Sequence, residues 1–97
     1  MTKIQILYPR LDAFVEIMKQ KLATPKNQGK LDPRDMFSED VLALLEREME
    51  ELRDAFKRRS AKDVTDECAD VANLAMMLAD NVSPLPAPPR EEGQNNG

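Results

Sequence analysis

The segment from Cys68 to Ala79 (CADVANLAMMLA) constrains the fold most, because only Asp70 and Asn73 in it are polar. A helix that is apolar nearly all round has to be covered by neighbours on several sides. The pattern therefore predicts a central helix from about Ser60 to Val82, ended by Pro84. A carboxylate within such a helix is costly unless it is paired or binds a metal, and few residues are available to pair with Asp70.

Two more helices are predicted from apolar residues that recur at three- and four-residue steps. The first runs from about Pro9 to Ala23 and the second from Ser38 to Arg58, with the Ser38 hydroxyl as the cap of the second. The second helix has an expected apolar stripe of Leu42, Leu45, Met49, Leu52 and Phe56. A short connection at Ser60 makes the second helix and the central helix antiparallel neighbours.

The sequence contains no strand pattern and no internal repeat, so the expected fold class is all-α. Of the 97 residues, 83–97 are rich in Pro, Gly, Asn and Glu and predict a disordered tail. Residues 1–82 are left as one domain with three main helices. Because a domain this small buries a limited share of its surface, we expect a bundle completed by oligomerisation, as a homodimer or a tetramer.

The charge balance excludes some classes of partner. There are 18 acidic and 14 basic residues and no histidine, for a net charge of -4. This excess argues against a broad nucleic-acid-binding surface. The one cysteine, Cys68, is expected to be a buried small side chain. Neither a signal peptide nor a long apolar run is visible, so we expect a cytoplasmic protein that does not bind membranes.

Two pairs of acidic residues carry the strongest chemical signal. Glu48 and Glu51 are three residues apart on one predicted helix, and Glu67 and Asp70 are three apart on the next, so each pair shares a helix face. Both pairs fall in the half of the hairpin nearest its turn. Carboxylate ligands select hard cations such as Mg²⁺ or Mn²⁺. The alternative is a solvated charged flank, which is the commoner explanation of a single E-x-x-E; the apolar surroundings of Asp70 favour the metal site.

The order of these residues resembles a known signature. Glu48-x-x-Glu51, 15 further residues and then Glu67-x-x-Asp70, within the segments EREMEELRDAF and DECADVANLAMMLADN, resemble the metal-binding motif of the all-α nucleoside triphosphate pyrophosphohydrolases, the MazG-like superfamily. The resemblance extends over residues 11–82 and is closest to short phage-type members. It implies cleavage of a nucleoside triphosphate between the α and β phosphates, with the four carboxylates holding Mg²⁺. One of them would accept a proton from water, and we favour Glu51.

The sequence departs from these relatives after the first helix, where they often carry Lys-Gly-Gly-Trp. The corresponding stretch here, from Asn27 to Leu31 (NQGKL), has a lysine and no tryptophan. Lys30 and Asn27 are therefore expected either to contact the substrate or to belong to an ordinary solvated loop. Asn73 either contacts the substrate or satisfies a contact between helices.

Two other functions stay open at this point. The chain could be a non-catalytic helical interaction module in which the acidic site is degenerate. It could also be a phosphoribosyl-ATP pyrophosphohydrolase of histidine synthesis, which shares the carboxylate scheme.

Overall fold

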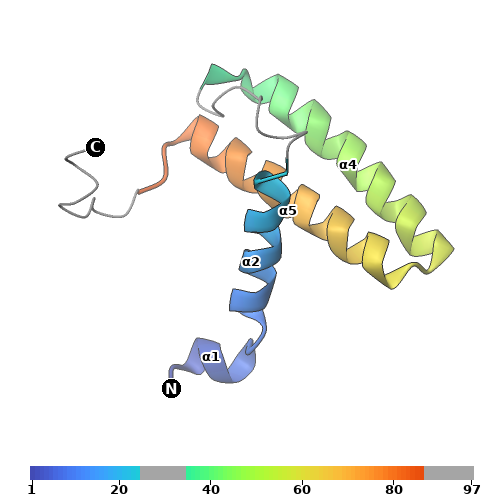
Figure 1. Cartoon of the computed structure of the whole chain (residues 1–97). Coiled ribbons are helices and arrows are strands. Elements are labelled where there is room, and N and C mark those ends of the chain that lie inside the picture. The colour runs from blue at the N-terminus through green and yellow to red at the C-terminus, as the bar shows by residue number, and fades with distance from the viewer. Residues whose placement is uncertain (25–34, 87–97) are drawn as a thin grey trace.

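The computed structural model describes residues 1–24 and 35–86 of the chain, and its regular structure is helical in both stretches (Figure 1). The helices are α1 (Lys3–Leu7), α2 (Leu11–Leu22), α4 (Ser38–Arg58) and α5 (Ala61–Val82). The long helices α4 and α5 lie side by side as an antiparallel hairpin, α2 packs against α5, and α1 lies at the far end of α2. The all-α prediction is confirmed.

Helix α5 occupies the centre of the chain, as its apolar sequence predicts. It contacts α4 on one side and α2 on another. Ala69 and Asn73 are its most buried residues. The helix begins where predicted, because the Oγ of Ser60 accepts a hydrogen bond from the backbone N–H of Asp63 at 3.3 Å. That bond satisfies one of the N–H groups left without a partner in the first turn.

Helix α4 has the predicted bounds, but the predicted role of Ser38 is wrong. Phe37 is the N-terminal cap residue, and it provides no side-chain hydrogen bond. The Ser38 hydroxyl instead donates to Oδ1 of Asn81 near the end of α5. Asn81 Nδ2 in turn donates to the carbonyl oxygen of Met36 at 2.5 Å. The hydroxyl is therefore used to tie the open end of the hairpin together.

The packed face of α4 agrees with the predicted stripe only in part. Val41 and Ala55 are fully buried, whereas Leu42, Met49 and Phe56 are exposed. The prediction selected the largest apolar side chains, but close packing of α4 on α5 favours small residues such as Ala55. The three exposed residues are spaced seven apart, so they form a second apolar stripe on another face of α4.

The short helix α1 was not predicted, and α2 begins at Leu11 rather than at Pro9. Thr2 and Gln5 form a capping box: Thr2 Oγ1 accepts from the Gln5 N–H at 3.1 Å, and Gln5 Oε1 accepts from the Thr2 N–H at 2.7 Å. Thr-x-x-Gln is a recognisable helix start. The segment was missed because its apolar residues alone are too few to show a helical period.

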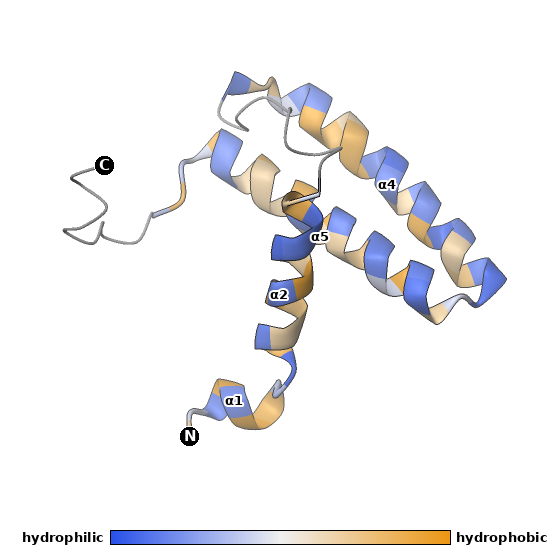
Figure 2. Cartoon of the chain, in the orientation of Figure 1, coloured by the Kyte–Doolittle hydropathy of each residue, from blue (hydrophilic) through white to orange (hydrophobic). Residues whose placement is uncertain are grey.

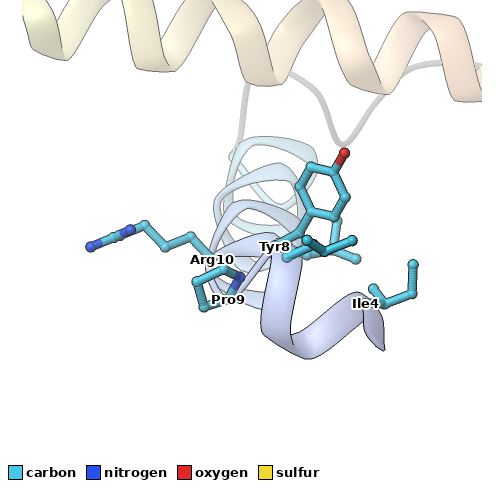
Figure 3. Close-up of a pocket in the computed structure, with 6 residues that line it drawn as sticks. Ile4, Tyr8, Pro9 and Arg10 are labelled. Atoms are coloured by element: carbon cyan, nitrogen blue, oxygen red, sulfur yellow. The ribbon is translucent and has the colours of Figure 1, made fainter. Parts of the chain in front are cut away.

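The N-terminal helices leave apolar surface in contact with solvent. Figure 2 shows hydrophobic residues on α1 and the adjoining part of α2, away from the hairpin. Where α1 meets α2, an open depression is lined by Ile4, Leu7, Tyr8, Pro9, Arg10 and Leu11 (Figure 3).

Beyond α5 the described chain is not helical, and the Leu85 N–H donates to Asp80 Oδ1 at 2.7 Å. Residues 87–97 of the predicted tail lie outside the described residues. Within the described stretches, no helix combines the length and the apolar composition that crossing a membrane requires.

Candidate metal centre

Carboxylates from the two helices of the hairpin converge where α4 faces α5. One carboxylate oxygen from each of Glu48, Glu67 and Asp70 lies within 4.8 Å of the other two. All three side chains are partly buried. Three of the four predicted ligands therefore lie together, although Glu48 is about twenty positions away from the other two in the sequence. The antiparallel hairpin is what aligns them, as the spacing from its turn predicts.

Glu48 lies in the packed face of α4 rather than beside it. It is seven residues from both Val41 and Ala55, which are fully buried, so the three side chains point in the same direction. Its Oε2 atom and the Oε2 atom of Glu67 are buried, and neither accepts a hydrogen bond from a donor in the described part of the chain. Buried acceptors without a donor are costly. These two oxygens therefore need either a shared proton or a cation.

The surroundings of Glu48 favour its protonated form. Removal from water raises the pKa of Glu48 from 4.5 to about 7, and the neighbouring carboxyl groups of Glu51 and Glu67 act in the same direction. The negative charges of Glu51 and Asp70 raise the pKa further. In the absence of a metal, a proton on Glu48 relieves part of the repulsion among these carboxylates.

Glu51 lies at the edge of the cluster. It is exposed and does not belong to the group of three whose oxygens converge. Its side chain nevertheless reaches Glu48. The structure thus places the fourth predicted ligand beside the other three, on the side open to solvent.

Asp70 has a partner that the sequence analysis did not foresee. The Nζ atom of Lys21 lies 3.4 Å from Asp70 Oδ2, and the two side chains are only 19% and 20% exposed. Few residues were expected to be available to pair with Asp70, but α2 places an ammonium group beside it from outside the hairpin. A weak signal existed in the spacing: Lys21 lies three residues after Met18 and seven after Phe14, so the three side chains share one face of the helix.

Asn73, one turn beyond Asp70, makes a contact between helices. Its side chain is 4% exposed, and its Nδ2 donates to the carbonyl oxygen of Met18 in α2 at 3.1 Å. Its Oδ1 accepts no hydrogen bond from the described residues. This contact matches one of the two roles expected for Asn73, while contact with a substrate stays a prediction. The other two predicted substrate contacts, Lys30 and Asn27, lie outside the described residues.

The donor set suits a hard divalent cation. The converging atoms are all carboxylate oxygens, the kind of ligand that Mg²⁺ and Mn²⁺ prefer. Two carboxylate oxygens of these residues are buried without a donor from the described part of the chain, so a cation there would satisfy acceptors that these residues leave unsatisfied. The cluster can therefore bind a metal. The open apolar depression at α1 lies on other residues and offers no charged acceptor.

A comparison with protein families supports this assignment of the hairpin. The model described as phosphoribosyl-ATP pyrophosphohydrolase matches residues 11–85, which include α2, α4 and α5 and all the converging carboxylates. No curated protein and no solved structure matches the chain significantly.

Proposed function

Because the chain belongs to the phosphoribosyl-ATP pyrophosphohydrolase family, within the MazG-like superfamily of all-α pyrophosphohydrolases, we propose that it is a metal-dependent nucleoside triphosphate pyrophosphohydrolase. The family makes it a pyrophosphohydrolase acting on nucleotide-type substrates. The finer proposal is cleavage between the α and β phosphates to give a nucleoside monophosphate and pyrophosphate. Mg²⁺ is the proposed cofactor, and Mn²⁺ would substitute for it.

The proposal rests on two buried oxygens, one on Glu48 and one on Glu67, that have no hydrogen-bond donor among the described residues. A protein that used these glutamates only for solubility would leave them exposed, where water satisfies them. In the proposed site, Glu48, Glu51, Glu67 and Asp70 hold the metal. When bound, the metal neutralises charge on the phosphates and lowers the pKa of a coordinated water.

Glu51 is the proposed proton acceptor. It is the one member of the four that is exposed, so a water molecule can reach it without displacing protein. A general base has to lie within hydrogen-bonding reach of the proton that it takes. Lys30 and Asn27, in the segment between α2 and α4, are the proposed contacts to the phosphates and the nucleoside. Asn73 is the proposed third contact, through the Oδ1 that accepts no bond from the described residues.

Phosphoribosyl-ATP is the second candidate substrate, favoured by the description of the matching family. It also carries a triphosphate that is cut to release pyrophosphate. The two proposals use the same carboxylates in the same roles, so they differ only in the nucleoside that has to fit beside the site.

The test is a panel of ribo- and deoxyribonucleoside triphosphates together with phosphoribosyl-ATP, each incubated with Mg²⁺ and scored for pyrophosphate and for orthophosphate. Release of pyrophosphate from a nucleoside triphosphate supports the first proposal, and release from phosphoribosyl-ATP alone supports the second. Orthophosphate as the first product, or no product from any member of the panel, would contradict both. The absence of any product would favour the non-catalytic interaction module.

A further inference from the structure

The ion pair between Lys21 and Asp70 links α2 to the carboxylate cluster. Lys21 lies in the last turn of α2, and Asp70 is one of the three residues whose oxygens converge. The pair is therefore different in kind from the surface ion pairs of this protein. Lys62 and Asp66, for example, are four residues apart on one helix, with the lysine side chain 84% exposed.

The position of Lys21 is fixed by a neighbouring hydrogen bond. The carbonyl oxygen of Met18, one turn before Lys21, accepts from Nδ2 of the buried Asn73, one turn after Asp70. Two contacts one turn apart thus hold the end of α2 against α5. Because the backbone that carries Lys21 is packed against α5, its ammonium group is already held near Asp70. Less entropy is therefore lost in forming this ion pair than in forming one from a mobile surface side chain.

A cation at this point competes with a metal. An ammonium group 3.4 Å from Asp70 Oδ2 and a divalent ion coordinated by Asp70 seek the same oxygen, and two cations at such a distance repel each other. Within residues 1–24 and 35–86, no ion pair places a cation against the carboxylate of Glu48 or Glu67. Asp70 is therefore the member of the cluster whose charge is already balanced before a metal binds.

From these contacts we propose that Lys21 is an internal counter-ion for the metal site. It holds Asp70 in place in the metal-free protein and gives this carboxylate up when a divalent cation binds. The inference rests on the proposed metal site and adds a positioning residue to it. Lys21 thereby stabilises the metal-free fold and weakens metal binding at the same time.

The experiment compares Lys21→Met with the wild-type chain in two measurements that need no turnover. In EDTA, urea unfolding of Lys21→Met is expected at a lower denaturant concentration, because Asp70 then faces the other carboxylates without its partner. In a calorimetric titration with MgCl₂, the same variant is expected to bind about threefold to tenfold more tightly, the effect of removing a competitor worth up to about 1.4 kcal/mol. If Lys21 had a purely structural role, its replacement would lower both the stability in EDTA and the affinity for Mg²⁺.

Lys62→Met is the matched control. It also removes one positive charge and one Lys–Asp ion pair, next to Asp66 rather than Asp70. Its dissociation constant for Mg²⁺ is expected to stay within about twofold of the wild-type value, since exposed charges are well screened. Equal tightening in the two variants would reduce the effect to general charge and overturn the proposal.

Lys21→Arg keeps the test decisive if the methionine variant folds poorly. Arginine retains the positive charge and bonds carboxylates well, so it is expected to preserve stability in EDTA and to bind Mg²⁺ no more tightly than the wild type. Tighter binding by Lys21→Arg would overturn the proposal. If the wild-type chain binds no divalent cation, both the proposed metal site and the proposed role of Lys21 are wrong. If the wild type binds Mg²⁺ and Lys21→Met leaves the affinity unchanged, only the role of Lys21 is wrong.

Discussion

Glu48 combines two properties that are hard to reconcile in a purely structural residue: it lies on the face of α4 that packs on α5, and it is ionisable. Its pKa is raised to about 7 in the metal-free protein, mainly because it is removed from water. The folded chain thus retains a proton that the unfolded chain has already lost. Since the folded state then binds more protons between pH 4.5 and about 7, its stability falls as the pH rises through this window.

The first prediction follows from this sign. In EDTA, the wild-type chain is expected to lose more of its free energy of unfolding between about pH 5 and pH 7.5 than Glu48→Gln, whose side chain cannot titrate. Urea unfolding followed by circular dichroism at the two pH values measures the difference. Identical pH dependence in the two chains would show that the proton is held elsewhere.

The second prediction separates Glu51 from its neighbour Glu50. Both are exposed on α4, but only Glu51 interacts with Glu48. If Glu51 is a metal ligand or the proton acceptor, Glu51→Gln should lower kcat by about 10²-fold or more. Glu50→Gln makes the same chemical change away from the cluster and should stay within a few-fold of the wild type. Equal losses in steady-state assays of pyrophosphate release would favour the surface-charge explanation of these glutamates.

The roles of these residues were predictable to different degrees. The spacing of Glu48, Glu67 and Asp70 on two helices sufficed to predict their convergence, because a helical hairpin has few ways to align two i, i+3 pairs. The partner of Asp70 was not predictable in the same way. Lys21 reaches it only because α2 packs against α5, and that contact joins residues about fifty positions apart.

At the scale of the helices, the turn between α4 and α5 decides the geometry of the site. Arg59 has φ 57° and ψ 33°, the left-handed conformation. Its N–H donates to the carbonyl of Phe56 at 3.0 Å, and the N–H of Ser60 donates to that of Ala55 at 3.4 Å. These bonds form a Schellman motif, in which glycine is the usual residue at the left-handed position.

The third prediction is that Arg59→Gly stabilises the fold by about 0.5–1 kcal/mol, because it removes the strain of a Cβ atom in the left-handed region. Lys57→Gly, inside the last turn of α4, is expected to cost up to about 1 kcal/mol instead. Thermal or urea unfolding of the two variants measures shifts of opposite sign. A loss of stability in Arg59→Gly would mean that the arginine side chain contributes more than its backbone strain costs.

Helix α4 shows which of its features could be predicted from sequence patterns. The bounds of α4 were predicted correctly because charge signals mark both ends, with Glu39 and Asp40 in the first turn and Lys57 and Arg58 in the last. The packed face was predicted only in part: Leu45 and Leu52 of the predicted stripe are half-buried, whereas its other three residues are exposed. Periodicity alone cannot say which of the two apolar stripes of α4 faces α5.

Taken as a whole, the single chain has little core of its own. Only Val41, Ala55 and Ala69 are buried hydrophobic residues in the part of the chain that the structure describes. The large apolar side chains of α1 and early α2 are exposed, and so is the stripe of Leu42, Met49 and Phe56 on α4. Monomeric proteins rarely leave so much apolar surface in contact with water. We therefore propose that a second copy of this chain covers the exposed stripe of α4, whose seven-residue spacing suits a helix of another chain.

The fourth prediction tests this assembly. Phe56 is 71% exposed, so Phe56→Glu should change the fold of the isolated chain little. At an interface, by contrast, a charge in place of an aromatic side chain is expected to weaken association by about 10-fold or more. Ala43→Glu adds the same charge on an exposed position of α4 outside the stripe and should leave association unchanged. Light scattering at micromolar concentration, with circular dichroism to verify folding, measures both variants, and a well-folded monomer of the wild-type chain would contradict the proposal outright.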